Sequence, residues 1–166
     1  MEGGGSEFDS FSLHIVLVHP EIHFNTGNVG RTCLATGSKL HLVRPLGFSL
    51  DDKEVRRAGL DYWPAVAPVV WEDFAAVERD LLPLGTPTFF SAEAKRSYWD
   101  RAYEGTSILI FGRESTGLDR AIRSKYGDAL VSLPQVQGFV RSLNLSNTVA
   151  VAAYEVLRQR RASRTE

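Results

Sequence analysis

The segment from Arg141 to Asn147 holds the side chains with the clearest chemical potential in this chain. It reads Arg-Ser-Leu-Asn-Leu-Ser-Asn and stands directly before a strongly apolar run, Thr148 to Leu157. Short polar side chains accept hydrogen bonds from the free N–H groups at a helix start, but a cap needs only one of them. An arginine there suits an anion, because the guanidinium and the unpaired N–H groups act together. Two interpretations stay open: an over-supplied helix cap, or the floor of a site for an anionic or polar ligand.

Such side chains need regular elements to position them, and the chain alternates short apolar runs with amphipathic or charged segments. The runs predict strands at 13–18, 40–43, 67–71, 88–91, 107–111 and 129–133. Helices are expected at 31–36, from 51 or 52 to 60, at 72–82, at 118–125 and along the C-terminal segment, with a glycine-rich turn at 25–30. This alternation predicts an α/β fold, with a mostly parallel sheet and helices on both faces.

Three polar, glycine-containing segments lie at the expected junctions or loops: 25–31, 112–117 and 135–147. In open parallel sheets, ligands bind where strands end and helices begin, at the carboxyl edge. We therefore expect the chemistry of this chain where these three segments meet.

Composition sets the outer limits. The chain has 166 residues, 43% of them hydrophobic, and we expect one domain at 11–161, with a flexible, linker-like segment at 1–10 and a polar tail at 162–166. The 19 basic and 20 acidic residues nearly cancel, so nucleic-acid binding would need basic residues gathered on one face.

The compartment is expected from two further observations. Cys33 is the only cysteine, which excludes an internal disulfide and a cysteine-based zinc cluster within one chain. No apolar run reaches the roughly 20 residues of a membrane span, and no signal peptide is recognised. We expect a cytoplasmic protein with no membrane partner.

Several common chemistries do not match. The segment 25–30 lacks the Gly-x-Gly-x-x-Gly spacing, and neither a Gly-Lys-Ser/Thr nor a Gly-x-Ser-x-Gly motif occurs. His14 and His41 fall within strand patterns and read as packing residues, whereas a metal site at His19 and His23 would need further ligands. The function left open by these exclusions is one in which arginines, a carboxylate and amide side chains position a ligand in a pocket.

Six motifs then carry a specific resemblance. They stand at 20–22, 25–31, 46–53, 57–63, 111–118 and 141–147, and include Asn-Thr-Gly-Asn-Val-Gly-Arg, Phe-Gly-Arg-Glu-Ser-Thr-Gly-Leu and Arg-Ser-Leu-Asn-Leu-Ser-Asn. In this order they closely resemble the SPOUT-superfamily tRNA 2′-O-methyltransferases. Within that superfamily the chain is similar to the small, single-domain subfamily that methylates the wobble nucleotide, position 34, over about residues 13–159.

The resemblance implies a C-terminal trefoil knot, a departure from the general rule that chains are unknotted. It implies the cofactor S-adenosylmethionine, with S-adenosylhomocysteine as product and no metal. Carried over by position, the cofactor pocket would include Ser91, Gly112, Leu133 and Ser142. The family works as a homodimer, with the terminal helix around Tyr154 near the partner subunit.

The resemblance places the functional arginine at Arg31. Methyl transfer needs the ribose oxygen held in line with the methyl group, and the hydroxyl proton must also be handled. Because the pKa of arginine lies above about 12, we expect Arg31 to act as electrostatic partner of a phosphate or of the developing alkoxide. A general base is the second interpretation, and a salt bridge at a helix start is the structural alternative.

Glu114, Ser142 and Asn144 complete the predicted catalytic set. Glu114 is equally suited to brace a loop backbone or an arginine such as Arg141. Asn25 and Asn144 could hold loop backbones or contact the nucleotide, because Asn tolerates left-handed turns. Ser142 is expected to contact the cofactor rather than to act covalently, since no histidine accompanies it.

The expected partner is the anticodon stem–loop of a tRNA, with predicted contacts at Asn25, Arg31, Lys53, Arg57 and Arg141. Basic residues followed by Tyr62 and Trp63 suit a phosphate contact beside a stacked base, although a solvated helix face with core aromatics explains them equally. Three alternatives stay open: 2′-O-methylation of another tRNA or rRNA site, a non-catalytic RNA-binding module of the same fold, or a small-molecule binder.

Overall fold

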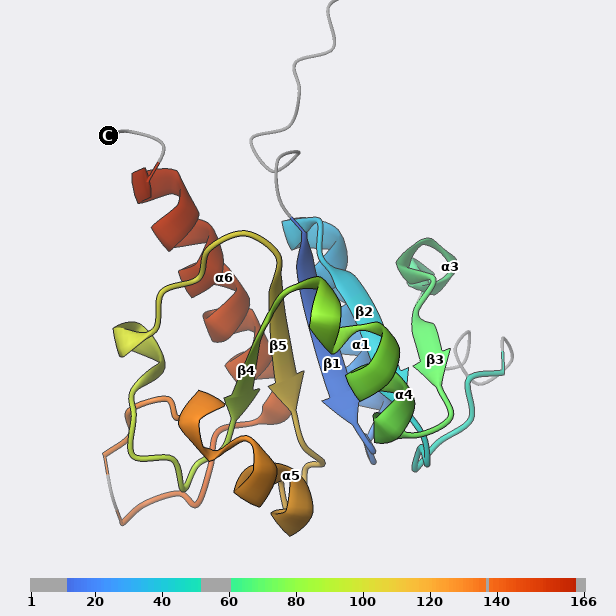
Figure 1. The fold of residues 1–166 in the computed structure, drawn as a ribbon. Helices are drawn as coiled ribbons and strands as arrows, with labels where there is room; N and C mark the ends of the chain where they lie inside the picture. Colours follow the sequence, from blue (N-terminus) through green and yellow to red (C-terminus); the bar gives the residue numbers. More distant parts are fainter. Residues whose placement is uncertain (1–11, 52–60, 137, 164–166) are drawn as a thin grey trace, which may run out of the picture.

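A computed structural model describes residues 12–51, 61–136 and 138–163 of the chain. Within these residues one six-stranded sheet, with all its strands parallel, has the order β3-β2-β1-β5-β4-β6 (Figure 1). The strands are β1 (Leu13–Val18), β2 (Lys39–Val43), β3 (Val69–Trp71), β4 (Thr86–Phe90), β5 (Ser107–Phe111) and β6 (Leu130–Val131). The predicted α/β class with a parallel sheet is confirmed.

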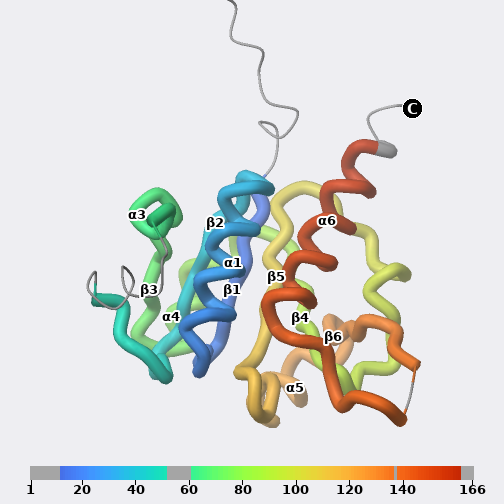
Figure 2. Tube along the Cα trace, turned by 180° about the vertical axis from the view of Figure 1, so that it is seen from behind, coloured from blue at the N-terminus to red at the C-terminus, as the bar shows by residue number. Residues whose placement is uncertain are grey.

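Helices cover both faces of this sheet. They are α1 (His23–Thr36), α3 (Trp63–Val66), α4 (Phe74–Asp80), α5 (Arg120–Lys125) and α6 (Leu145–Ser163), with 3₁₀ turns η1 (Leu82–Leu84), η2 (Tyr98–Asp100) and η3 (Gly127–Ala129). Figure 2 shows α1 and α6 side by side on one face, and α4 lies on the other. No helix of the described part is long and apolar enough to cross a lipid bilayer.

Two apolar cores lie on the two faces of the sheet. Leu13, Ile15 and Leu17 of β1 face the core beneath α1 and α6, whereas Val16 and Val18 face the core beneath α4 and α5. Side chains alternate between faces along a strand, so a strand covered on both sides reads as an unbroken apolar run. This is why the runs at 13–18 and 107–111 predicted their strands with the observed bounds.

Other expectations differ in their limits. Of the strand predicted at 129–133, only Leu130 and Val131 form β6. Ser132 pairs with Ser97 instead of continuing the pairing with β4. The helix predicted at 72–82 is α4, whose N-cap Asp73 accepts a hydrogen bond from the Ala76 N–H at 2.8 Å. The helix expected to end at 60 lies outside the described residues from 52 onward. The trefoil knot stays a prediction.

The glycine-rich turn predicted at 25–30 is wrong, because these residues form the first turns of α1. Tertiary contacts override the weak helix propensity of glycine and asparagine. The hydroxyl of Tyr62 donates to the Gly27 carbonyl at 2.9 Å, and a Cβ on Gly30 would lie 2.9 Å from the Trp63 ring. The glycine therefore lets α3 pack directly against α1.

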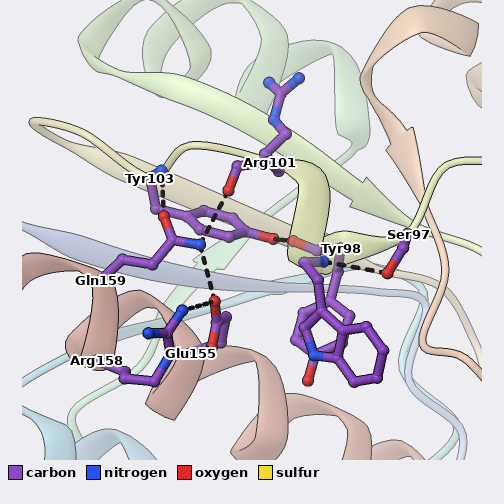
Figure 3. Close-up of polar contacts among 8 residues, drawn as sticks. Ser97, Tyr98, Arg101, Tyr103, Glu155, Arg158 and Gln159 are labelled. Carbon is purple, nitrogen blue, oxygen red and sulfur yellow. Dashed lines mark hydrogen bonds and ion pairs between the residues drawn. The ribbon is translucent and has the colours of Figure 1, made fainter.

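The terminal helix is held in place by polar contacts to the chain between β4 and β5 (Figure 3). The Gln159 side-chain amide donates to the Arg101 carbonyl at 3.0 Å, and its oxygen accepts from the Tyr103 N–H at 3.2 Å. The same amide donates to Glu155, and the Tyr103 hydroxyl donates to the Tyr98 carbonyl at 3.1 Å. Burial raises the pKa of the Tyr103 phenol, which stays a neutral donor.

Two hydrogen bonds link three rings across β1, β2 and β3. The Trp71 indole N–H donates to Nδ1 of His41 at 3.1 Å, and Nε2 of His41 lies 2.8 Å from Nδ1 of His14. Since His41 accepts at Nδ1, its proton sits on Nε2 and is donated to His14. Burial, with His14 and Lys39 nearby, lowers the pKa of His41 to about 3.

This buried imidazole predicts a loss of stability in acid. The unfolded chain takes up a proton on His41 below pH 6.5, whereas the folded protein resists it down to about pH 3, so stability falls as the pH drops through this window. At pH 5 the expected loss from His41 is about 2 kcal/mol relative to pH 7. Urea unfolding at both pH values, for the wild type and His41→Gln, measures it.

The Gln variant keeps an acceptor for the indole and a donor for His14, and it should lose about 2 kcal/mol less than the wild type between the two pH values. His23→Gln, at an exposed histidine of α1, serves as the matched control. Equal pH dependence of all three proteins would contradict the assignment.

Candidate active site

A cavity of about 790 Å³ lies at the carboxyl edge of the sheet, among the loops that follow β4, β5 and β6 and the start of α6. Its volume falls within the range of small-molecule sites. The segments 112–117 and 135–147 that the sequence singled out both contribute to it, together with Asn25 of α1. The three segments therefore meet, as expected at the carboxyl edge of a parallel sheet.

The turn after β5 forms one wall and is very tight. The Arg113 N–H donates to the Gly117 carbonyl at 3.2 Å, and the Gly117 N–H donates back to Arg113 at 2.9 Å. A Cβ on Gly112 would lie 2.0 Å from the Gly117 carbonyl carbon, so only glycine leaves room for this return of the chain. Glu114 lies within this turn, and its side chain reaches the start of α1.

Glu114 joins this turn to the start of α1. Its carboxylate accepts hydrogen bonds from the N–H groups of Glu21 at 2.8 Å and Ile22 at 3.1 Å, and from the Asn25 side-chain amide at 3.2 Å. Ile22 is the N-cap residue of α1 and provides no side-chain cap of its own. A carboxylate from the distant loop after β5 thus lies against the N-terminus of the helix, where negative charge is favourable.

Glu21 and Ser115 make the reciprocal contact. The Ser115 N–H and hydroxyl each donate to the Glu21 carboxylate at 2.9 Å. These two hydrogen bonds lower the pKa of Glu21, with a smaller contribution from the Arg113 charge. Two glutamates therefore link the loops after β1 and β5, each accepting hydrogen bonds from the other loop. We call these contacts, of Glu21 with Ser115 and of Glu114 with Glu21, Ile22 and Asn25, the glutamate clasp.

Asn144 extends the clasp to the terminal helix. Its amide donates to the Asn25 side-chain oxygen at 3.0 Å, and its own oxygen accepts from the Ser146 N–H at 2.9 Å and the Asn147 N–H at 3.3 Å. Asn144 is thus the residue that caps α6. Arg141 donates to the Ser115 carbonyl from the same loop.

Beside the cavity, His19 at the end of β1 forms a polar cluster that sequence reasoning did not single out. The Arg113 guanidinium lies 2.7 Å from Nδ1 of His19 and 2.8 Å from the Asp119 carboxylate. Burial and the Arg113 charge lower the pKa of His19, and a neutral ring can accept the Arg113 hydrogen bond at Nδ1. His19 contacts an arginine and an aspartate here, rather than forming the metal pair considered with His23.

The cavity wall offers both apolar surface and unsatisfied polar atoms. The Phe90 and Phe111 rings stack with centroids 4.5 Å apart. Among the described residues, Oε1 of Gln135 and the Nε atoms of Arg113 and Arg123 are buried without a hydrogen-bond partner, and all three side chains line the cavity. Buried polar groups need partners, so this set fits a ligand with an apolar ring, an N–H donor and an acceptor or anionic group.

The predicted residues divide into three groups. Eight of them line the cavity: Ser91, Gly112, Leu133 and Ser142 from the predicted cofactor set, and Asn25, Glu114, Arg141 and Asn144 from the predicted catalytic and RNA sets. Arg31 does not line it; this exposed side chain lies on α1 with its guanidinium 5.9 Å from the centre of the Tyr62 ring. Lys53 and Arg57 lie outside the described residues.

Sequence reasoning missed Gln135 and Arg123 as individual wall residues, along with Phe90 and Phe111. Gln135 falls inside the segment that was singled out, so its position in the loop was a usable signal. Arg123 lies on α5, outside the three segments that the sequence singled out, and reaches the cavity only through the tertiary fold.

The fold and the site define an α/β domain with a ligand-sized cavity among the loops at the carboxyl edge of a parallel sheet. The chain belongs to the SpoU rRNA methylase family, whose sequence profile matches residues 12–154. A tRNA (cytidine(34)-2′-O)-methyltransferase of Burkholderia pseudomallei is 45% identical over 152 residues, which cover 89% of this chain and 95% of the relative. Its counterpart in Burkholderia ambifaria is 42% identical with the same coverage.

Solved structures agree with this family. One that concerns the 2-OH methylation of C/U34 on tRNA superposes with a TM-score of 0.82 at 41% identity, covering 92% of this chain and 99% of the other. An AdoMet-bound rRNA methyltransferase of Sinorhizobium meliloti has a TM-score of 0.74 at 23% identity, over 91% of this chain and 57% of the other. The second likeness is one of fold.

The clasp predicts that the Glu114 carboxylate matters for stability. In the wild type, two backbone N–H groups and the Asn25 amide donate to the two oxygens of the Glu114 carboxylate. Glu114→Gln leaves a single, uncharged acceptor oxygen for these three donors. We expect the free energy of unfolding to fall by about 2 kcal/mol, in the range of hydrogen bonds to charged groups. Urea denaturation at pH 7 measures the change.

The matched control is Glu72→Gln, which removes the charge from a carboxylate that is 88% exposed and 3.7 Å from Arg44. A surface pair of this kind contributes about 0–1 kcal/mol. If both variants lose the same small amount, the clasp does not stabilise the fold.

Proposed function

We propose that this protein transfers a methyl group from S-adenosylmethionine to the ribose 2′-hydroxyl of nucleotide 34 in a tRNA anticodon. The proposal rests on one combination: more than 40% identity over about nine-tenths of the chain to enzymes named for this reaction, with the predicted cofactor residues gathered in a single cavity. S-adenosylhomocysteine is then the second product.

The cavity residues fit this cofactor. Phe90 and Phe111 supply apolar surface for a ring, Gln135 offers an unsatisfied acceptor for an amino group, and Arg113 and Arg123 offer N–H donors for a carboxylate. Ser91, Gly112, Leu133 and Ser142 complete the proposed pocket. When bound, S-adenosylmethionine supplies a sulfonium methyl group that an oxygen nucleophile can take.

The role of the protein is then to position and to stabilise charge. Reaction requires the ribose oxygen close to the methyl carbon and in line with the breaking bond, and fixed geometry supplies much of the rate. Glu114, Asn25 and Asn144 hold the loops that define this geometry. Ser142 is proposed as a cofactor contact, because it lines the cavity and no histidine stands beside it.

Arg31 is proposed as the electrostatic partner of the substrate. Its guanidinium is exposed on α1, the helix that also carries Asn25 into the cavity wall. We infer that this cation meets an RNA phosphate or the developing alkoxide when the RNA lies over the cavity. Arg141 is a second exposed cation at the cavity, and Lys53 and Arg57 stay proposed contacts of the anticodon stem–loop.

We further propose a homodimer through the face formed by α1 and α6. This face exposes large apolar side chains: Phe24 (58%), Tyr154 (55%), Leu34 (42%) and Val151 (42%). Large exposed apolar side chains on one face are typical of protein interfaces. Residues 11–161 are proposed as a single methyltransferase domain, flanked by the linker-like segment at 1–10 and the tail at 162–166, acting in the cytoplasm on tRNA.

The function is tested by incubating the purified protein with total tRNA and, separately, with rRNA, each together with S-adenosylmethionine labelled in the methyl group. We expect label in tRNA, and mapping by nuclease digestion and mass spectrometry to locate a 2′-O-methyl group at nucleotide 34. Label at another tRNA position, or in rRNA only, would replace the proposed site by the alternative one. No transfer to any RNA, with cofactor bound, would indicate a non-catalytic module.

The same assay tests Arg31. Arg31→Ala should lower kcat by at least about 100-fold, because it removes a charge that acts on the transition state. Cofactor affinity should stay unchanged, since Arg31 lies outside the cavity. Arg79→Ala, which removes an exposed arginine paired with Asp80 on α4, is the control and should keep full activity. Near-normal turnover of Arg31→Ala would remove the residue from the mechanism.

A further inference from the structure

Phe139 is the most exposed large apolar side chain among the described residues, with 87% of its surface accessible. Val136, at 78%, and Val140, at 60%, lie in the same loop. A phenylalanine ring left in water forgoes the favourable burial that most such rings obtain. Three exposed apolar side chains within five positions therefore indicate a surface that is covered when the protein works.

The loop lies at the cavity. Gln135 and Arg141, on either side of Phe139, both line the cavity, whereas Phe139 itself does not. Arg141 donates to the Ser115 carbonyl, and Asn144 ties the end of the loop to Asn25. The ring thus stands in a loop whose flanking residues line the cavity and whose C-terminal part is anchored, and it is not part of the wall that would enclose the cofactor.

The chemistry around the ring favours an RNA base as the group that covers it. Arg141 stands two residues along, exposed and positively charged, and suits a phosphate of the same strand. A ribose that reaches a methyl group in the cavity must bring unpaired nucleotides to the mouth. Unpaired bases stack on exposed aromatic side chains whatever their sequence, because each base has a flat π-face.

A second copy of the chain is the other candidate to cover this surface. The dimer proposed above uses the α1 and α6 face, where Phe24, Leu34, Val151 and Tyr154 already provide apolar area. Phe139 stands instead in the loop between two residues of the cavity wall, where the substrate must arrive. The position thus favours RNA.

We propose that Phe139 is a substrate-specificity residue whose ring stacks on an unpaired base of the RNA at the cavity mouth. This inference rests on the proposed function and deepens it, by naming the contact that selects a single-stranded loop over a duplex. A base within a duplex has both faces covered by its neighbours, so the ring gains nothing from it.

The test compares the full-length wild type with Phe139→Ala, Phe139→Leu and Phe139→Trp, using an anticodon stem–loop RNA and labelled S-adenosylmethionine. For the Ala and Leu variants we expect the KM for RNA to rise about tenfold, equal to about 1.4 kcal/mol. The kcat and the cofactor affinity should stay unchanged. The Trp variant should keep the wild-type KM within about twofold, because it retains a stacking face.

Leu84→Ala is the matched control, since Leu84 is a 64% exposed apolar side chain in η1, before β4 begins and away from the carboxyl edge. The inference is overturned if all Phe139 variants keep the wild-type KM, if Leu replaces Phe without loss, or if Phe139→Ala changes the dimer mass in light scattering. Failure of the proposed function would appear separately, as absence of methylation by the wild type. Fluorescence anisotropy of labelled RNA then still compares RNA binding by the wild type and the three Phe139 variants.

Discussion

The geometry of this site depends on the hydrogen bonds that the Glu114 carboxylate accepts. It satisfies two backbone N–H groups at the start of α1 and one amide of Asn25, although Glu114 lies about 90 residues further along the chain. Asn25 in turn meets Asn144, 119 residues away. Parallel strands bring these segments to one edge of the sheet, but the sheet does not fix how their loops lie relative to one another. The carboxylate does so, because leaving the N–H groups unsatisfied would be costly.

This constraint separates the residues that hold the site from those that are free to contact ligands. Glu21, Glu114, Asn25 and Asn144 use their polar atoms on one another and on backbone groups. By contrast, Arg31 on α1 and Arg141 and Phe139 in the loop before α6 expose their side chains to solvent. Asn25 and Asn144, for which loop support and nucleotide contact were both open, therefore have observed roles as loop supports.

The sequence predicted the sheet better than it predicted the site. Unbroken apolar runs revealed β1 and β5 with the observed bounds, since a buried strand needs no other signal. The helix predicted at 31–36 is the second half of α1, but residues 25–30 of the same helix were predicted as a turn, because local propensity does not register the packing of Trp63 on Gly30. The cap of α6 was placed in the right segment, but only folding selects Asn144 among its polar neighbours. A loop backbone was one of the two partners expected for Glu114 and is the one observed, but no pattern in the chain could identify a loop about 90 residues away.

The near-neutral net charge of −1 then has a physical explanation that is compatible with RNA recognition. Around the cavity, both glutamates of the clasp are engaged with backbone N–H groups, whose partial positive charges they offset. They therefore oppose a phosphate less than two free carboxylates would. Arg113 and Arg123 already pair with Asp119 and Glu93, so the unopposed positive field at the mouth is small. Affinity for RNA must accordingly come from a few well-placed contacts, and shape and stacking must supply what a broad basic surface supplies elsewhere.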